Sequence, residues 1–261
     1  MSYFSGHYFK HENNGKTIAF IVGKSSENGK FIQVITDKKS YRFKGYGNCI
    51  FTKNGAKIDI GNSIKGVIKY GKLTPLKYDI MGPFKALEPL MECSHSIISM
   101  RHNLRGWVNL DGEFFDLDGG VGYIEGDRGR SFPKSYLWTQ CNFKNDCSFS
   151  LSIAEIPFMG FKFQGCICLI SHRAKEYRLA TYLGVKILHC DSRQVILRQG
   201  KYLLIADISP TAGHKLAAPR NGKMNREIRE CIACPLRVRF YEGGRLTFDK
   251  SSGRASFEFM S

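Results

Sequence analysis

Residues 148–156 read SFSLSIAEI, a strict alternation of apolar and small or polar residues. In an extended chain Phe149, Leu151 and Ile153 point to one side and the residues between them to the other, because side chains alternate along a strand. This stretch therefore predicts a strand with one buried face. Helical periodicity is nearly absent elsewhere, and only residues 84–92, FKALEPLME, predict one short turn of helix.

Turn signals separate many further strand candidates. Residues 106–117, GWVNLDGEFFDL, place Asp111-Gly112 between two alternating arms, which is typical of a hairpin whose turn needs positive φ. About twenty strand candidates follow one another at short spacing, and a single small barrel holds only about eight. Four more turns are predicted at these positions: Asn54-Gly55, Gln199-Gly200, Gly243-Gly244 and Ser251–Gly253.

We therefore expect an all-β chain of two barrel-like halves. The break between them should fall near residues 105–130, and we divide the chain into halves 1–120 and 121–261. No linker, low-complexity segment or short repeat marks the boundary, so the halves should pack together directly.

Composition and charge limit the classes of function. Hydrophobic residues make up 43% of the chain and charged residues 24%, which is typical of a globular protein. No run of about 18 apolar residues predicts a transmembrane helix. The first residues lack a secretory signal, so a cytoplasmic location with nine reduced cysteines is expected.

The net charge of +16 could attract nucleic acid, an anionic membrane or an acidic ligand. Basic residues are spread along the whole chain, which favours a basic surface without a specific partner. Residues 220–239 are rich in arginine but lack the closely spaced stacking aromatics of single-strand binders, so nucleic acid is not the expected partner. Peripheral membrane contact stays open, and the sequence does not give the oligomeric state.

Two carboxylates mark the stretch 122–142, GYIEGDRGRSFPKSYLWTQCN. In a strand Glu125 and Asp127 share one face with Tyr123, and their side chains lie about 6 to 7 Å apart. A desolvated carboxyl with a raised pKa is what a general acid requires. The alternative is a charged turn at the surface, in which Arg128 and Arg130 neutralise the two acids.

The following strand, LWTQCN, adds a polar face. Trp138, Gln140 and Asn142 would share one side of it, and each polar end would need a buried partner. If this strand pairs with the one that carries Glu125 and Asp127, the two form a polar patch in an aromatic-lined cavity.

Other candidates are weaker. Cys231-x-x-Cys234 has the spacing of a zinc knuckle but needs two more ligands, so we expect ordinary thiols and no metal. His7, His95 and His102 could act as acids or bases, although isolated histidines on strands are more often structural. No phosphate-binding loop or serine-nucleophile motif is present, and no cofactor is expected.

Three stretches resemble the tocopherol cyclase family. YFSGHYFK with IAFIVG is similar to that family's opening motif, PLKYDIMGPFKALEPLMECSHSIISMRHNL follows its pattern, and GWVNLDGEFFDLDGGVGYIEGDRGRSFPKSYLWTQCN resembles its central signature. The resemblance covers about residues 3–145. The matching positions are Tyr3, Gly6, Tyr8, Phe9, Tyr123, Glu125, Asp127, Gly129, Phe132, Pro133, Trp138, Gln140, Cys141 and Asn142.

The resemblance implies a two-part, lipocalin-like antiparallel β-barrel architecture, related to carotenoid hydratase-type proteins, with an apolar cavity for an isoprenoid. It also implies that Glu125 or Asp127 protonates a prenyl double bond in cyclase chemistry. The sequence departs from the family at Ser5, His7, Gly126 and Arg128. An arginine in place of a tryptophan would oppose a carbocation if it faced the cavity, and would suit an anionic head group instead.

Our leading hypothesis is a lipocalin-like protein that holds a small hydrophobic or amphiphilic ligand. The first alternative is a tocopherol cyclase-type enzyme that closes a chromanol ring on a prenylated quinol, and the second is a basic surface for nucleic acid or anionic membrane. The sequence does not decide between binding protein and enzyme. The candidate catalytic residues are Glu125 and Asp127, and the candidate ligand-binding residues are Tyr3, His7, Tyr123, Arg128, Trp138, Gln140 and Asn142.

Overall fold

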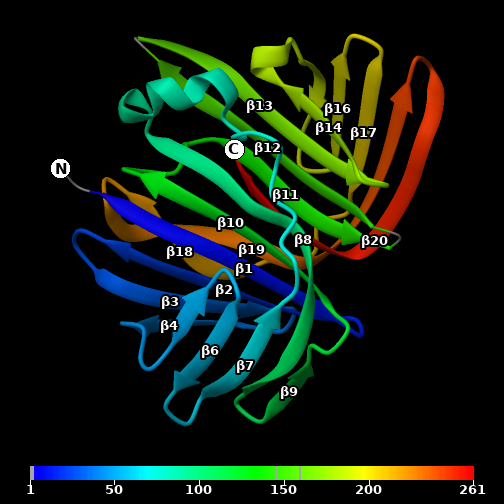
Figure 1. Cartoon of the computed structure of the whole chain (residues 1–261). Coiled ribbons are helices and arrows are strands. Elements are labelled where there is room, and N and C mark those ends of the chain that lie inside the picture. The colour runs from blue at the N-terminus through cyan, green and yellow to red at the C-terminus, as the bar shows by residue number, and fades with distance from the viewer. Residues whose placement is uncertain (1–2, 145, 159) are drawn as a thin grey trace. The chain divides into compact units, whose positions relative to one another are not determined.

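The structure is a computed structural model that describes residues 3–144, 146–158 and 160–261 (Figure 1). Among these residues are twenty strands and two 3-10 helices, η1 (Gly82–Leu90) and η2 (Thr181–Leu183). The all-β prediction is confirmed, and η1 occupies the stretch where one short helix was expected. None of the helices in the described residues is long and apolar enough to cross a membrane.

Contacts divide the chain into two compact units. Unit 1 takes the chain up to Leu76, then Cys93–Phe132 and Leu216–Glu227. Unit 2 takes Lys77–Glu92, Pro133–Lys215 and Ile228–Ser261. Each unit is therefore built from separate stretches of sequence, while the division into halves 1–120 and 121–261 stays a prediction.

The first ten strands form one antiparallel sheet in the order β4-β3-β2-β1-β10-β8-β7-β6-β5, with β9 paired to β8. Figure 1 shows the first strand, β1, beside β10. The strands are β1 (Phe4–Asn13), β2 (Lys16–Ser25), β3 (Gly29–Thr36), β4 (Ser40–Lys44), β5 (Ile50–Thr52), β6 (Gly55–Ile60), β7 (Ile64–Tyr70), β8 (Cys93–Leu110), β9 (Glu113–Asp116) and β10 (Val121–Gly129).

This sheet curls around one apolar core. Buried side chains from eight of the strands meet in a single cluster, which includes Phe9 of β1, Phe20 of β2 and Ile124 of β10. Tyr41 and Phe43 of β4 and Phe51 of β5 pack against the same cluster, although these strands lie at opposite ends of the sheet order. A sheet whose two ends share one core has the architecture of a barrel.

The last ten strands form a second antiparallel sheet, in the order β14-β13-β12-β11-β20-β19-β17-β16-β15, with β18 paired to β19. The strands are β11 (Tyr136–Phe143), β12 (Cys147–Phe158), β13 (Phe161–His172), β14 (Lys175–Ala180), β15 (Lys186–Cys190), β16 (Gln194–Gln199), β17 (Tyr202–Ile208), β18 (His214–Arg220), β19 (Lys223–Glu242) and β20 (Arg245–Met260).

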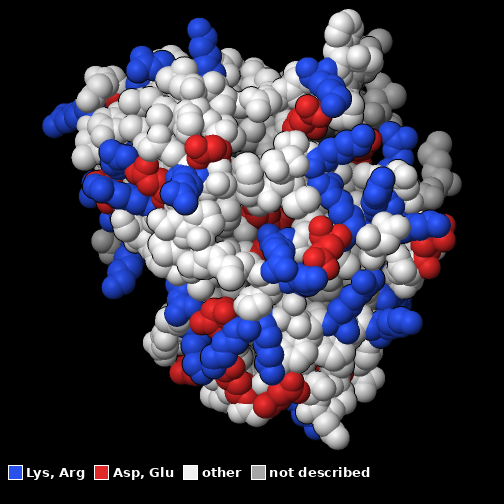
Figure 2. Space-filling view, turned by 180° about the vertical axis from the view of Figure 1, so that it is seen from behind, with Lys and Arg blue, Asp and Glu red and all other residues white. Residues whose placement is uncertain are grey.

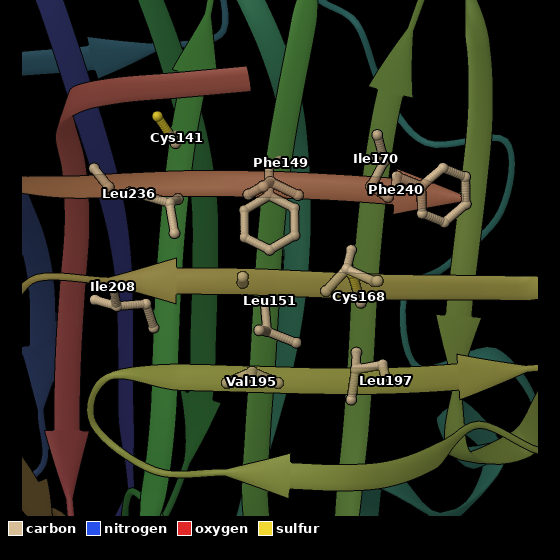
Figure 3. Close-up of a cluster of buried hydrophobic side chains, with 14 of the residues drawn as sticks. Cys141, Phe149, Leu151, Cys168, Ile170, Val195, Leu197, Ile208, Leu236 and Phe240 are labelled. Carbon is tan, nitrogen blue, oxygen red and sulfur yellow. The ribbon is translucent and has the colours of Figure 1, made fainter. Parts of the chain in front are cut away.

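The core of unit 2 explains the sequence SFSLSIAEI. Phe149, Leu151 and Ile153 are all buried in it, as their alternation predicted. Figure 3 shows side chains from β11, β12 and β13 pointing toward side chains from β16, β17 and β19. The space between the two walls of this second barrel is thus filled by interleaved apolar side chains.

The two sheets repeat one plan. Strands β1–β4 form one arm, β5–β7 form the other, and the last strand β10 lies between them; β11–β14, β15–β17 and β20 have the same order. The sequence shows no short repeat because most positions on these strands need only to be apolar or polar, and many residues satisfy that requirement.

The turns test the predicted hairpins. Asp111 and Gly112 have positive φ, as do Gly243 and Gly244, which confirms both turns. The hairpin predicted at Asn54-Gly55 exists, but its turn lies at residues 53 and 54, because Gly55 already begins β6. The turn predicted at Ser251–Gly253 is wrong, because β20 runs through these residues and accommodates them with an irregular register against β19.

Candidate functional site

A cluster of four polar side chains lies on β8 and β10 of unit 1. Asp127 stands opposite His95 in the antiparallel register, so both side chains leave the sheet on the same side. The His95 ring donates from Nδ1 to Oδ1 of Asp127 at 2.8 Å, and its Nε2 lies 3.5 Å from Oε2 of Glu125. Tyr123 donates its hydroxyl to the same Oε2 atom at 2.6 Å. We call these residues the His95 cluster.

The members of the His95 cluster differ in their access to solvent. Tyr123 is fully buried and Glu125 nearly so. The side chain of His95 is 15% exposed and that of Asp127 is 24% exposed. The four groups therefore lead from a solvent-accessible carboxylate, through an imidazole, to a buried carboxyl and phenol.

The neighbouring strand β1 extends this polar face. Tyr8 stands opposite Glu125, and Lys10 stands opposite Tyr123. Lys10 is fully buried and forms an ion pair with Glu12 at 2.7 Å. A buried lysine requires such a partner, since desolvation of an uncompensated charge costs several kcal/mol. These residues face away from the apolar core of unit 1, to which Phe9 and Ile124 belong.

Two of the predicted ligand-binding residues, His7 and Arg128, lie on the opposite face of the same strands. His7 stands opposite Gly126, and a methyl group on Gly126 would lie 3.0 Å from the His7 ring. Arg128 is exposed and shares this face with Gly126 and Ile124, because it alternates with Asp127 along β10. The structure therefore does not bring His7 or Arg128 to the face of the His95 cluster.

Tyr3 lies just before β1 and is 41% exposed. Its backbone N–H donates to the hydroxyl of Ser26 at 2.6 Å. The predicted charged turn is not observed either, because Asp127, Arg128 and Gly129 all belong to β10, and Asp127 bonds to His95.

Trp138, Gln140 and Asn142 share one buried face of β11, as their alternation predicted. Asn142 accepts a hydrogen bond from the Ser148 hydroxyl at 2.8 Å. The pairing with the strand of Glu125, on which the polar patch depended, does not occur: β11 pairs with β12 and β20 in unit 2, whereas β10 pairs with β1 and β8 in unit 1. Consecutive strands separate here because each completes its own sheet.

Unit 2 contains a second tyrosine–carboxyl pair. Tyr136 donates its hydroxyl to Oε2 of Glu258 at 2.6 Å, and both residues are buried. Glu258 stands opposite Trp138 on β11, as Glu125 stands opposite Tyr8 on β1. Because β20 has the place in its sheet that β10 has in the other, the two glutamates lie on corresponding strands. Sequence reasoning did not identify Glu258.

His95 belongs to the cluster, but sequence reasoning treated it only as one of several isolated histidines. Its alternation along β8 indicates a face, but only the register between β8 and β10 brings it to Asp127. That register shifts twice, between Gly122 and Ile124 and between Ile124 and Glu125, and neither shift could be predicted from the sequence.

The core of unit 1 contains a separate polar group. His11 and Tyr70 stack and share a hydrogen bond between Nε2 and the hydroxyl at 3.0 Å, and the His102 ring lies 4.7 Å from the Tyr70 ring. Burial lowers the pKa of His11 to about 3, with a further decrease from His102, and burial lowers the pKa of His102 to about 4. Both rings are therefore neutral at ordinary pH, and they serve as structural residues.

A metal could be held at the His95 cluster. Ligand atoms of His95, Glu125 and Asp127 lie within 4.8 Å of one another. Among the described residues, these three side chains form a group that could hold a metal ion. However, Nδ1 of His95 faces Asp127 and Nε2 faces Glu125, and a single ion binds only one ring nitrogen. The geometry suits an imidazole between two acids better than a metal site.

Solved structures show which fold this is. The chain is similar to a crystal structure of CghA with Sch210972, with a TM-score of 0.65 and 8% sequence identity. The match covers 99% of this chain and 88% of the CghA chain. The chain has a lipocalin-like fold. The chain is also similar to a crystal structure of kievitone hydratase from Nectria haematococca, with a TM-score of 0.53 and 9% sequence identity. That match covers 99% of this chain and 88% of the hydratase chain. No family model and no curated protein matches the chain.

The lipocalin-like architecture expected from the sequence is thus confirmed. At such low identities the likeness extends to the fold alone, and it does not single out the tocopherol cyclases. Figure 2 shows one face of the molecule on which Lys and Arg side chains are interspersed with Asp and Glu. The predicted basic surface for nucleic acid or membrane stays a prediction.

Proposed function

We propose that this protein binds a small, largely apolar molecule and transfers a proton to or from it at the His95 cluster. The observation that carries the proposal is the position of His95, with one ring nitrogen on Asp127 and the other beside Glu125. An imidazole held by one carboxylate and facing a second acid–base group is an arrangement suited to proton transfer.

The exposures suggest the direction of the proton path. Asp127 has access to solvent and orients the imidazole, which can take up a proton at one nitrogen as it releases one from the other. Glu125 and Tyr123 are the most buried members, so they would exchange the proton with the ligand. General acid–base catalysis of this kind contributes about 10²–10⁴-fold to a rate.

The ligand class rests on the fold and on the chemistry of the site. The His95 cluster faces away from the apolar core of unit 1, so a ligand at the cluster would lie outside that core. An apolar molecule there gains about 25 cal/mol for each Å² of surface that it buries. One of the similar solved structures is named a hydratase. Hydration of a carbon–carbon double bond needs a proton donor and a polar group that handles water, and the His95 cluster supplies both kinds of group.

A second candidate is ring closure of a prenylated quinol, the reaction of the tocopherol cyclases. The departures Gly126 and Arg128 spoke against it only if they faced the ligand together with Glu125. Both residues share the opposite face of β10, so they leave the carboxyl face of the family signature unchanged. Glu125 would then protonate the prenyl double bond, and the phenol oxygen would capture the resulting cation.

The first experiment searches for the ligand and the proton transfer together. Purified protein is mixed with prenylated hydroquinones, fatty acids and hydroxylated aromatic compounds, and bound molecules are identified by native mass spectrometry. Compounds that bind are then incubated with the protein in D₂O. We expect deuterium at a new C–H bond of the product, and a chromanol product would identify the cyclase reaction.

Variants then test the site. Glu125→Gln and His95→Asn should reduce deuterium incorporation by at least about 100-fold while the ligand still binds. A matched control is Asp191→Asn, which removes an exposed His–Asp pair of 2.9 Å in unit 2 and should change nothing. Full activity of both site variants would refute the proton-transfer role, and binding without any product would reduce the proposal to a ligand-binding protein.

A further inference from the structure

The pair Cys231 and Cys234 lies on β19 in unit 2, where the strand is irregular. Cys231 stands opposite Phe257 of β20, and Cys234 stands opposite Ala255. Three steps along β19 thus match two steps along β20, which is the signature of a β-bulge. In a regular strand residues three apart point to opposite faces, but the bulge turns both thiols into the same apolar core.

The two thiols have different hydrogen-bond partners. Thr211 Oγ1 lies 2.8 Å from the sulfur of Cys231. The sulfur of Cys234 lies 3.5 Å from the Ser209 carbonyl oxygen and 3.7 Å from the Pro235 carbonyl oxygen, so its single proton has several acceptors within reach. The hydrogen bond from Cys234 and the one from Thr211 lower the pKa of the Cys231 thiol, although its burial acts in the opposite direction. The same contact with Cys231, together with burial, raises the pKa of Cys234.

A short loop covers this pair. Thr211 is exposed although its hydroxyl contacts Cys231, which is only 5% exposed. The next part of the loop lies directly on β19, since a methyl group on Gly213 would come within 2.9 Å of the Glu230 backbone. Arg229 holds this end of the loop through the Gly213 carbonyl oxygen at 3.0 Å. One layer of loop thus separates the Cys231 thiol from solvent.

We propose that Cys231 and Cys234 are a thiol–disulfide redox pair, in which Cys231 is the nucleophile and Cys234 resolves the intermediate. With glutathione disulfide as oxidant, the Cys231 thiolate attacks one sulfur and releases one reduced glutathione. The Cys234 thiol then loses its proton and displaces the second glutathione, which leaves the Cys231–Cys234 disulfide. The two protein thiols are oxidised by two electrons and one glutathione disulfide is reduced.

The structure favours this role over a zinc knuckle. A structural zinc needs four ligands, and the group of three potential ligands found among the described residues is the His95 cluster of unit 1. The unequal thiols are instead what thiol exchange requires, because a thiolate attacks fastest and a second thiol beside it completes the disulfide. The proposal is independent of the function proposed for unit 1.

The test uses the full chain in native buffer. Reduced protein is equilibrated with glutathione mixtures of increasing oxidised fraction, quenched with acid, alkylated and digested with trypsin. Residues 230–237, ECIACPLR, form one tryptic peptide that contains both cysteines. As the mixture becomes more oxidising, we expect the doubly alkylated peptide to be replaced by a peptide without alkyl groups. Its mass should be lower by two hydrogen atoms than that of the same peptide with two free thiols.

Variants assign the two roles. Cys234→Ser should leave glutathione attached to Cys231, and Cys231→Ser should prevent fast modification of Cys234. Thr211→Val should slow the reaction several-fold, because it removes one hydrogen bond to the attacking sulfur. Cys166 and Cys168 are an internal control: they alternate on β13 in the same core, and burial raises the pKa of both thiols.

Two results would overturn the proposal. One is a peptide 230–237 that stays fully alkylated even in the most oxidising mixture. The other is oxidation of Cys166 and Cys168 at the same rate, since that would reflect general access to the core rather than a prepared pair.

Discussion

Acid should weaken this protein through two neutral histidines in the core of unit 1. Folding lowers the pKa of His11 to about 3 and that of His102 to about 4, whereas an unfolded histidine titrates near 6.5. Below pH 6.5 the unfolded chain therefore binds more protons than the folded chain. The free energy of unfolding must fall as the pH falls through this window, and the fall ends near the folded pKa values.

The size of the effect follows from these values. Each pH unit in the window costs about 1.4 kcal/mol for each histidine, so a change from pH 6.5 to pH 5 costs about 2 kcal/mol for each ring and about 4 kcal/mol for the pair. The rings contact Phe20, Tyr70 and Ser99, which carry no negative charge that could stabilise an imidazolium. A loss of about 4 kcal/mol is a large part of a typical unfolding free energy of about 5–15 kcal/mol.

Urea unfolding at pH 7, 6 and 5, at constant ionic strength, measures this dependence. Replacement of His11 or His102 by Gln should reduce the difference between pH 7 and pH 5 by about 2 kcal/mol, even if the variant is less stable at every pH. His189→Gln is the control, because the His189 side chain is 45% exposed, and its curve should match that of the unmodified protein. An acid dependence that survives the double replacement of His11 and His102 would refute the reasoning.

Three further predictions concern single side chains. Gly122→Ala places a methyl group 2.3 Å from Nε2 of His102, so thermal unfolding should show a loss of about 1–3 kcal/mol, and a loss below 0.5 kcal/mol would contradict the packing. Tyr123→Phe removes the hydroxyl that donates to Glu125, and we expect a cost of about 1–2 kcal/mol in urea unfolding together with slower proton transfer. Arg178→Ala removes bonds to two backbone carbonyl oxygens just before η1, so limited proteolysis should cut there faster than in the unmodified protein, and equal rates would refute this anchoring role.

The candidate site shows how far local patterns reach. Alternation placed Tyr123, Glu125 and Asp127 on one face, and the structure agrees. Alternation could not place His95 beside them, because β8 and β10 are separate in sequence and meet across an irregular register. Nor could it separate β10 from β11, since the next strand in a chain pairs with its predecessor in most β proteins.

The motif Cys231-x-x-Cys234 shows the same limit in unit 2. Its spacing is that of a zinc knuckle, although we expected ordinary thiols, and only the bulge in β19 brings both sulfurs into one apolar core. Glu258 gives no sequence signal, because its significance depends on the tyrosine of β11 that stands beside it and on the shared plan of the two sheets.

The sequence alone determined that this chain is all-β, that it has about twenty strands, and which side chains share a face. These properties depend on neighbours along the chain: the two-residue period of a strand and the positive φ of turn residues such as Asp111. Only the tertiary structure decided the sheet order, the strand registers and the meeting of His95 with Asp127. Those features depend on contacts between distant strands, and the apolar or polar pattern of a strand does not identify its partner.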